Sequence, residues 1–394
     1  MRRPARNPAM DAVAIANAAT TGFVASNRAR SAGSLAVEAS TAVLRDTGLV
    51  AADIDGICGS AVPTAPWMQA ALGIPEVTWF ANPMIPFGNH IAAAVSAVHG
   101  GLCDTVLVYH AAYRMAWNTA SALKDPFRRA LTPGASTASA GPETIAGAVG
   151  YTAWASRYLH QYGTTREQLG LVALNDRANA QRNPAAAMRE PMTMDDYLAA
   201  RMIRWPLCLY DMDVPVDGAD AFVVTTAERA RDLPHPPVLV HATTLGMIAR
   251  NNEDQQPNLR DTGQRVVIEA LKARSDLWLD DVDVYFPYDG FSIIALNWIE
   301  SAGWCGPGEA AAFLAQHWDD ATGRVLIGGR VPINPHGGAL SEGGTQGSGH
   351  VREAVHQLQG RAGERQVDGA RTALVTPGGF FFNAQGMVLR RGCS

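Results

Sequence analysis

A glycine-rich stretch is the first candidate for chemistry in this chain of 394 residues. It runs from Asn334 to His350 and reads NPHGGALSEGGTQGSGH. Glycine allows unusual φ/ψ angles and a close approach of the backbone, and a helix N-terminus facing the stretch would favour a developing negative charge. The stretch is therefore a candidate binding loop for an anionic intermediate, although a tight strand-to-helix turn would also account for its glycines. The phosphate-binding spacings GxGxxG and GxxxxGKS/T do not occur in it.

Two histidines at equivalent places of a repeated pattern are candidates for proton transfer. The segments NHIAAAVSAVHGG and GHVREAVHQLQG begin near His90 and His350, and both predict amphipathic helices that end at glycine. The dipole of a helix biases a histidine near its N-terminus toward the neutral form, which suits a base or a hydrogen-bond donor. A structural or capping role is the alternative for each of them. His336 is expected to line the glycine-rich stretch or to cap its turn.

A second repeat extends the internal similarity over most of the chain. STAVLRDTGLVAADIDGICGS and VIEALKARSDLWLDDVDVYFP each read as a helix, a turn and a strand. A duplicated α/β fold is the simplest account. Prolines in AERARDLPHPPV mark the connector between the halves. We therefore expect a flexible N-terminal arm over 1–10, an N-terminal half over 11–232 with an inserted loop domain at about 113–205, and a C-terminal half over 236–394.

Composition and charge argue against several classes of protein. Hydrophobic residues make up 47% and charged residues 18%, and the net charge of −5 arises from interspersed signs, so no basic surface indicates nucleic acid. The five cysteines occur singly, which argues against a disulfide framework and a zinc site. The sequence contains no apolar run of the roughly 18–20 residues that span a bilayer. We expect a cytoplasmic protein that binds neither a metal nor a membrane.

The order of four motifs resembles the thiolase superfamily. The motifs are LAVEASTAVLRDTGLVAADIDGI, PLCLYDMDVPVDGADAFVVTTAERA, VYFPYDGFS and the glycine-rich stretch, and the resemblance covers about Asp11 to Leu389. The chain resembles most closely the sterol-carrier-protein-type thiolases and thiolase-like lipid-transfer proteins, including the steroid side-chain aldolases. This resemblance implies a duplicated five-layered αβαβα core with an inserted CoA-binding loop domain. It also implies that the stretch approaches the acyl-thioester end of the substrate, through Gly343, Gly344, Gly347, Ser348, Gly349 and His336.

Four active-site positions of the thiolases carry other residues here. The region of the nucleophilic cysteine reads NPMIPFGNHIAAAV, the catalytic histidine falls on Gly344, and the second cysteine falls on or near Thr376. Acyl-cysteine chemistry therefore lacks its residues. The asparagine of the thiolase Asn-Glu-Ala-Phe motif falls on Tyr288, where similar aldolases carry a tyrosine that transfers protons. Those aldolases carry a second tyrosine near the position of Ser348, for which the two helix histidines are the natural substitutes.

These residues favour a thiolase-fold lyase that cleaves the side chain of a bulky β-hydroxyacyl-CoA, such as a steroid-CoA, by retro-aldol chemistry. The reaction needs a base for the hydroxyl group, a stabiliser for the thioester enolate and an acid to reprotonate it. Tyr288, His350 and His90 are the predicted catalytic residues. Tyr288 would need positive surroundings or a hydrogen-bond donor to act as a base near neutral pH, and a satisfied core tyrosine is the alternative. No cofactor is expected beyond the CoA of the substrate.

Two other functions remain open at this point. A non-catalytic thiolase-like subunit or acyl-CoA/lipid-binding protein would explain the lost catalytic residues, and an acyltransferase would require Cys58 or Cys103 as its nucleophile. The resemblance also implies a homodimer and a small OB-fold and zinc-ribbon partner chain, which together would give a heterotetramer. Five arginines of the inserted segment could contact CoA phosphates or form a solvated face: Arg177, Arg182, Arg189, Arg201 and Arg204.

Overall fold

The computed structural model describes residues 7–25, 30–60, 62–83, 86–114, 148–249, 258–379 and 384–393. Nine strands form one mixed sheet. From edge to edge its order is β3 (Trp79–Ala81), β2 (Gly56–Gly59), β4 (Thr105–Tyr113), β7 (Asp217–Thr226), β1 (Val13–Thr20), β8 (Val238–Gly246), β14 (Ala384–Arg391), β13 (Thr372–Thr376) and β9 (Val284–Pro287). The register between β1 and β8 consists of two residue pairs, Ala14 with Leu239 and Ile15 with Val238, so this junction divides the sheet into two parts.

The two parts of the sheet repeat one topology. In the first, β2 is parallel to β4, while β4, β7 and β1 are antiparallel neighbours. In the second, β9 is parallel to β13, while β13, β14 and β8 are antiparallel neighbours. The helices α1 (Ala32–Thr47) and α10 (Gly263–Arg274) follow the first strand of each part, and α3 (Gly88–His99) and α13 (Ser348–Gln359) precede β4 and β13. The duplicated α/β fold predicted from the sequence repeats is confirmed.

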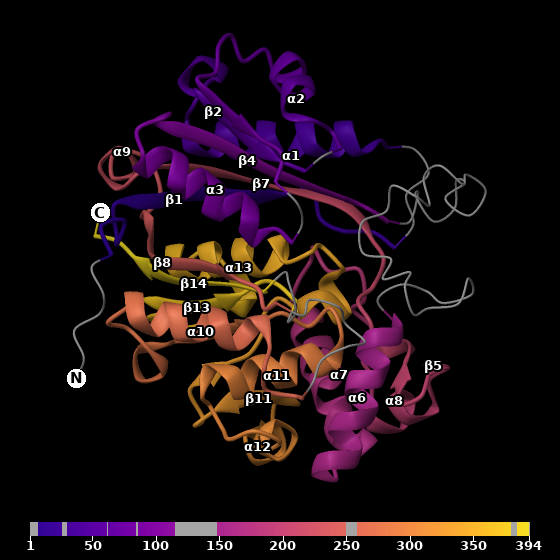
Figure 1. Ribbon diagram of the computed structural model, residues 1–394. Helices are drawn as coiled ribbons and strands as arrows, with labels where there is room; N and C mark the ends of the chain where they lie inside the picture. Colours follow the sequence, from indigo (N-terminus) through magenta and orange to yellow (C-terminus); the bar gives the residue numbers. More distant parts are fainter. Residues whose placement is uncertain are drawn as a thin grey trace.

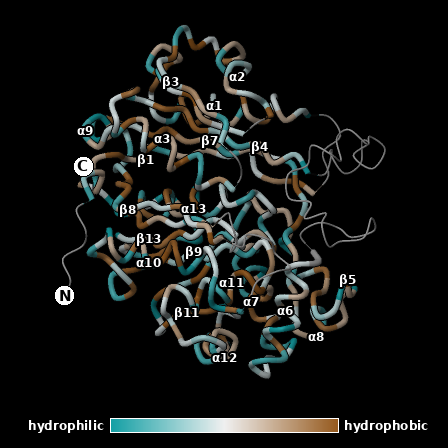
Figure 2. Tube along the Cα trace, viewed as in Figure 1, coloured by the Kyte–Doolittle hydropathy of each residue, from teal (hydrophilic) through white to brown (hydrophobic). Residues whose placement is uncertain are grey.

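The helices and the two parts of the sheet form five layers (Figure 1). The outer face of the first part carries α1 and α2 (Ala65–Leu72), the space between the parts holds α3 and α13, and the outer face of the second part carries α10 and α11 (Ser292–Ala302). Hydrophobic residues follow the strands and the helix faces that meet them (Figure 2). Removal of these apolar faces from water stabilises the stack, and the predicted αβαβα core is confirmed.

Capping residues fix the ends of the helices that frame the site. Ser31 and Ser34 form a capping box at the start of α1, and Gly48 ends that helix with a φ angle of 71°. The N-cap and C-cap of α13 are Gly347 and Gly360, with φ angles of 93° and 74°. Such left-handed conformations favour glycine, so the glycines that mark both ends of α13 in the sequence have a backbone cause.

The segment between β4 and β7 carries helices that lie outside the layered core. It contains α6 (Ala148–Tyr162), α7 (Arg166–Ala180), α8 (Met194–Ala199) and the pair β5 (Met202–Arg204) and β6 (Leu207–Cys208). These elements lie beside α11 and α12 (Ala310–Gln316) and a small sheet of β10 (Trp318–Asp319), β11 (Arg324–Ile327) and β12 (Val331–Pro332) (Figure 1). The short α9 (Ala227–Ala230) follows β7. Part of the predicted insertion, 115–147, lies outside the described residues.

The predicted arm and the predicted boundaries of the halves remain predictions. Residues 1–6 of the arm lie outside the described residues, and Asn7 donates hydrogen bonds to the carbonyls of His241 and Arg274 at 3.1 and 3.2 Å. The connector between the predicted halves ends where β8 begins, at Val238. In the described part of the chain, no helix has both the length and the apolar character needed to cross a membrane.

Candidate active site

A cavity of about 570 Å³ lies between the inserted segment and the C-terminal half. Its volume falls in the range of roughly 300–1,000 Å³ that is typical of small-molecule sites. Most of the wall is apolar, from Tyr151, Met188, Ile203, Leu209, Met212, Val214, Phe291, Ile294 and Leu340. The polar groups come from Arg114, Arg177, Tyr210, Asp213, Tyr288 and Gln346. Few polar groups in an apolar wall are the usual composition of a ligand site, so this cavity is the candidate active site.

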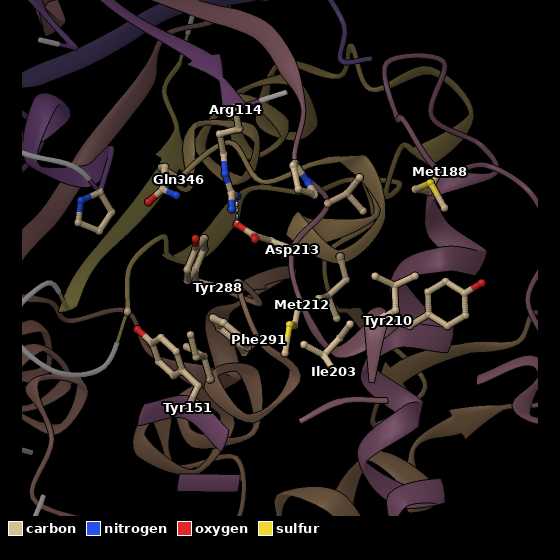
Figure 3. A pocket seen from close by; sticks show the side chains of 18 of the residues that line it. Arg114, Tyr151, Met188, Ile203, Tyr210, Met212, Asp213, Tyr288, Phe291 and Gln346 are labelled. Atoms are coloured by element: carbon tan, nitrogen blue, oxygen red, sulfur yellow. Dashed lines mark hydrogen bonds and ion pairs between the residues drawn. The ribbon is translucent and has the colours of Figure 1, made fainter. Parts of the chain in front are cut away.

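Tyr288 follows β9 directly and lines this cavity. Its backbone N–H donates to the carbonyl of Thr376 at 3.1 Å, which continues the pairing of β9 with β13. Its hydroxyl group points toward Arg114 and Asp213 (Figure 3). Gly290 leaves room for this orientation, because a Cβ at that position would lie 2.7 Å from the hydroxyl oxygen. The phenol is therefore held against a charged pair at one end of the cavity.

Arg114 and Asp213 form this charged pair. The N–H of Asp213 donates to the carbonyl of Gly290 at 3.1 Å, which fixes the pair to the turn after Tyr288. The Asp213 carboxylate raises the pKa of Arg114 above its usual value. A Cβ at Gly344 would collide with both charged groups. The pair thus fills the space beside the position onto which the thiolase histidine falls.

The pKa of Tyr288 is raised above its ordinary value. Burial is the largest cause, and the carboxylates of Asp213 and Asp289 act in the same direction, against the opposite effect of Arg114. The positive group expected beside a tyrosine base is present, but burial and the two carboxylates outweigh it. The phenol is neutral and suits a proton donor or hydrogen-bond donor. The carboxylate of Asp213 at the same end of the cavity is better suited to act as the base.

His350 lies behind Tyr288, as the third residue of α13. Its ring centroid is 5.6 Å from that of Tyr288 and 4.7 Å from that of His336. Its Nε2 lies 2.9 Å from Oδ1 of Asp289, whose carboxylate also accepts hydrogen bonds from two backbone N–H groups of the glycine-rich stretch. His350 is buried and does not line the cavity. It therefore contacts the reacting region through the ring of Tyr288.

A second carboxyl group, that of Asp176 on α7, lies close to Asp289. Burial and then the neighbouring Asp289 raise the pKa of Asp176 well above its usual value. Burial also raises the pKa of Asp289, but the hydrogen bond and the charge of His350 bring it below its ordinary value. One proton therefore resides on Asp176, and the charge of Asp289 faces His350. The pair links the inserted segment to the turn that carries Tyr288.

His90 does not join this group, although its position repeats that of His350. It is the third residue of α3 and is fully buried. Its ring stacks on Phe87 with the centroids 5.3 Å apart, and it lies 6.1 Å from the ring of His110. Burial and then His110 lower the pKa of His90 to about 3, so the ring is neutral. The duplication thus places His90 and His350 in two different environments, and the cavity lies beside that of His350.

Backbone conformation and close packing account for the glycines of the glycine-rich stretch. A π-helical turn spans Gly338–Glu342, between Gly337 with φ 103° and Gly343 with φ 150°. A Cβ at Gly347 would lie 2.8 Å from the Cβ of Pro377. The tight turn that was the alternative interpretation of these glycines is therefore part of the structure.

The cavity wall contains other residues of the stretch than the six predicted to bind substrate. Leu340 and Gln346 line it. The N–H of Gly344 donates to the carbonyl of Val214 at 2.7 Å, and the Oγ of Ser348 donates to Asp220 at 2.6 Å. Substrate contact stays a prediction for the six positions, none of which lines the cavity: Gly343, Gly344, Gly347, Ser348, Gly349 and His336.

Three polar residues of the cavity, Arg114, Asp213 and Gln346, were missed by reasoning from the sequence. Arg114 comes directly after β4, and Asp213 lies inside the motif PLCLYDMDVPVDGADAFVVTTAERA. Gln346 lies inside the glycine-rich stretch itself. Each lies inside a recognised motif or directly after a strand, and that position is the one signal that the sequence offered for them.

A buried ion network lies on the other side of the stretch. Arg352 on α13 is fully enclosed, and its Nη1 donates to Oδ1 of Asp220 at 2.7 Å while its Nη2 pairs with Glu342. Burial raises the pKa of Glu342 to about 7, although Arg352 acts in the opposite direction. One guanidinium group cannot neutralise two buried carboxylates, so Glu342 is the member that takes up a proton.

Glu342→Gln should change how the free energy of unfolding depends on pH. Folded Glu342 keeps its proton up to a pKa of about 7, whereas the unfolded group loses it near 4.5, so the wild-type fold loses stability as pH rises through this window. Glutamine cannot titrate. Relative to the variant, the wild type should therefore lose about 2–3 kcal/mol between pH 5 and pH 8. Urea unfolding at both pH values measures this, and a pH-independent difference would contradict the assignment.

The five cysteines offer no activated thiolate at the cavity. All are free thiols, and none lines the cavity. Burial raises the pKa of Cys58, and it raises the pKa of Cys103 and Cys305 to about 12 and that of Cys208 to about 11. The thiolate is the nucleophilic form of cysteine, so an acyltransferase that uses Cys58 or Cys103 lacks its nucleophile.

The sequence of this chain is similar to those of known proteins. Residues 248–391 match the family model described as thiolase C-terminal domain-like. The chain is 33% identical over 388 residues to a steroid side-chain-cleaving aldolase of Thermomonospora curvata, with 93% of this chain and 95% of the relative covered. It is 34% identical over 378 residues to a 17-hydroxy-3-oxo-4-pregnene-20-carboxyl-CoA lyase of Mycobacterium tuberculosis, with 89% and 92% covered.

Solved structures agree with these matches. An Ltp2-ChsH2(DUF35) aldolase has a TM-score of 0.85 and 31% identity, over 97% of this chain and 98% of that chain. A monomeric SCP2-thiolase-like protein type 1 of Mycobacterium smegmatis shares the fold, with a TM-score of 0.69 and 18% identity, over 99% and 79%. The fold is that of the thiolase superfamily, and the site lacks the catalytic cysteine of the thiolases. Within that superfamily, the chain belongs to the family of steroid side-chain-cleaving aldolases. The enzyme class predicted from the sequence, a carbon–carbon lyase acting on acyl-CoA, is confirmed.

Proposed function

We propose that this lyase cleaves the side chain of a bulky β-hydroxyacyl-CoA, such as a steroid-CoA, at the Tyr288 end of the cavity. One observation carries the proposal: a neutral phenol and a carboxylate, those of Tyr288 and Asp213, share one end of a mostly apolar cavity of about 570 Å³. The names of the two relatives, both steroid-directed, support a polycyclic acyl group. CoA enters as part of the substrate, and no further cofactor belongs to the proposal.

In the proposed reaction, Asp213 takes the proton of the β-hydroxyl group. The Cα–Cβ bond breaks, the hydroxyl carbon becomes a ketone or aldehyde, and the bonding electron pair moves onto the thioester as an enolate. Tyr288 gives its proton to Cα, and the proton held by Asp213 returns to the phenolate, so no net proton is gained or lost. Arg114 supplies positive charge. The backbone N–H of Gln346, a residue of the cavity wall, has no acceptor in the described part of the chain and can donate to the enolate oxygen.

His350 and Asp289 are positioning residues in this proposal. They contact Tyr288 and its turn from the side opposite the cavity, and the 2.9 Å hydrogen bond between them fixes the ring of His350. His336 packs against His350, and we assign it the same positioning role. His90 takes no part, because its ring faces Phe87 and His110 in the other half.

Gly344→Ala is expected to lower cleavage activity by about 10-fold or more while the fold remains intact. The added methyl group would push the flexible ends of Arg114 and Asp213 away from Tyr288, and misplacing a reacting group by about 1 Å can cost on the order of 100-fold in rate. Steady-state kinetics and thermal unfolding provide the check. Gly100→Ala is the matched control, because Gly100 ends α3 at φ −79° and lies outside the cavity. Equal activity of the two variants would contradict the role given to the charged pair.

Product analysis tests the proposed function. The purified protein is incubated with a panel of β-hydroxyacyl-CoAs, with and without a candidate partner chain, and carbonyl product and shortened acyl-CoA are measured. Equal amounts of the two products support the proposal. Binding of acyl-CoA without cleavage in every combination would instead support the non-catalytic subunit that the sequence left open.

A partner protein, a homodimer and a cytoplasmic location complete the proposal. The solved Ltp2-ChsH2(DUF35) aldolase carries two component names, which supports a complex with a second protein, here a small OB-fold and zinc-ribbon chain. Two copies of each chain would give a heterotetramer. The free cysteines fit a reducing compartment.

The exposed edge of the sheet is the surface we expect two copies to share. β3 is the terminal strand, and its Phe80 is 58% exposed. Edge strands with unpaired backbone groups readily pair with another chain. Phe80→Lys should therefore shift the mass in sedimentation experiments from a dimer to a monomer. An unchanged mass would place the dimer contact elsewhere or exclude it.

A further inference from the structure

Arg177 on α7 is a buried cation in the wall of the cavity. Its side chain is 4% exposed. Its Nε donates to the Oγ of Ser341 at 3.1 Å, and its Nη1 donates to the carbonyl of Glu190 at 3.3 Å. The guanidinium group lies over the ring of Tyr210, 5.3 Å from the centroid. Among the described residues, no carboxylate lies within ion-pair distance of it.

A buried charge without a counter-charge is unfavourable. Burial lowers the pKa of Arg177, and the opposite effect of Tyr210 is smaller. Proteins keep such groups where a ligand supplies the missing partner, and perturbed ionisable groups in clefts are accordingly enriched at functional sites. The Nη2 group is the part of the guanidinium for which the described residues offer no acceptor. The wall position of Arg177 makes the cavity the source of that acceptor.

Arg177 marks the end of the cavity opposite the reacting groups. Tyr210 and Met188 lie on one side of the cavity, and Tyr288 and Gln346 lie on the other (Figure 3). Because Arg177 contacts the ring of Tyr210, it belongs to the first side. Apolar side chains, including those of Met212, Ile203 and Phe291, lie between the two ends (Figure 3).

We propose that Arg177 binds an acceptor oxygen, an oxo or carboxylate group, at the end of the acyl group remote from the thioester. This inference rests on the proposed function, which places the thioester at Tyr288. The pairing Nε with Nη2 and the pairing Nη1 with Nη2 are the two bidentate faces of a guanidinium, and each has one arm engaged by the protein. Nη2 alone can donate to a single carbonyl or carboxylate oxygen, whereas the bidentate contact that arginine frequently makes with a phosphate group has no complete face free here.

The position of Arg177 separates it from the other arginines of the inserted segment. Arg189, Arg201 and Arg204 are exposed, as expected of a solvated face, whereas Arg177 is enclosed. Arg189 lies near Arg177 in the chain and donates to the carbonyl of Gln181 at 3.2 Å. It therefore offers a matched control for the loss of one arginine from the same segment.

Binding measurements with uncleavable thioesters test the proposal. The probes are two fused-ring acyl-CoAs without a β-hydroxyl group, identical except that one carries a ring ketone far from the thioester, and free CoA. Calorimetry should show that the wild type prefers the ketone-bearing probe by about 10- to 100-fold, the usual effect of a hydrogen bond to a charged group. Arg177→Met should abolish this preference and leave the affinity for CoA unchanged. Arg189→Met should retain the preference.

Two results would overturn the proposal. An equal loss of affinity for both probes and for free CoA in Arg177→Met would show a contact with a CoA phosphate, and equal affinities of the wild type for the two probes would show no oxygen site. Arg177→Gln, which keeps hydrogen-bonding groups but no charge, repeats the test if the methionine variant does not fold. Binding requires no turnover. A preference for the ketone-bearing probe, in a protein that cleaves none of the β-hydroxyacyl-CoAs of the product assay, would therefore refute the proposed reaction and leave the recognition site standing.

Discussion

Tyr288→Phe should lower kcat/KM for carbon–carbon cleavage by about 10²- to 10⁴-fold, the usual contribution of a positioned acid–base group. The substitution removes one hydroxyl group, which points at the pair of Arg114 and Asp213 in the cavity (Figure 3). The ring would still pack against His350, so the fold and the affinity for acyl-CoA should be retained. Single-turnover kinetics, with acyl-CoA binding measured in parallel, separate loss of chemistry from loss of binding.

Tyr285→Phe is the matched control for this experiment. Tyr285 lies three residues earlier on β9, is fully buried and does not line the cavity. Removal of its hydroxyl group should leave the rate of cleavage within about 2-fold, since a substitution away from the site changes no transition-state contact. Comparable losses in both variants would mean that the phenol of Tyr288 acts through the core and not through the substrate.

Arg352→Met should lower the free energy of unfolding by about 3–5 kcal/mol, the usual cost of breaking a buried ion pair by removing one partner. Arg352 is 2% exposed and serves both Asp220 and Glu342. Its guanidinium group also lies over the ring of Phe23, 5.5 Å from the centroid. Without it, Glu342 can take up a proton near neutral pH, but the buried carboxyl group of Asp220 loses its guanidinium partner. Urea unfolding at pH 7 measures the loss.

Arg361→Met provides the comparison for Arg352. Arg361 also pairs with a carboxylate, that of Asp46 at 2.6 Å, but its side chain is 32% exposed. Water screens exposed pairs, so its loss should cost about 0–1 kcal/mol. Equal losses in the free energy of unfolding would contradict the claim that burial makes the network around Arg352 important for stability.

The duplicated core could be predicted because each half carries the same local patterns. The helices that contain His90 and His350 have the same periodicity and the same glycine ends, and both occupy the central layer. The φ angle of Gly360, 74°, shows why a glycine ends the second of them. Tyr288 could be selected because it follows a buried strand in a position that the motif order defines.

The functional distinction between the two halves was not visible in those patterns. Equal spacing predicts equal places in the repeat, but the surroundings differ: His350 meets Asp289 and Tyr288, whereas His90 meets Phe87 and His110. Side-chain partners come from segments far apart in the chain, so a local pattern does not contain them.

The charged pair was missed for the same physical reason. Arg114 follows β4 and Asp213 precedes β7, and the whole inserted segment separates them in the sequence. Their ion pair occupies space that the missing side chain of Gly344 leaves open. A glycine in the sequence shows that space is needed, but it does not show which groups fill that space.

Cleavage of a β-hydroxyacyl-CoA in D₂O, without added CoA, tests the central claim most directly. A retro-aldol reaction predicts equal amounts of a carbonyl product and a shortened acyl-CoA that carries one deuterium at Cα, because the enolate is protonated from an exchangeable group of the enzyme. Products that form only when free CoA is added would indicate thiolysis. That result, or intact substrate that remains bound without reaction, would contradict the assignment of Tyr288 and Asp213 to carbon–carbon cleavage.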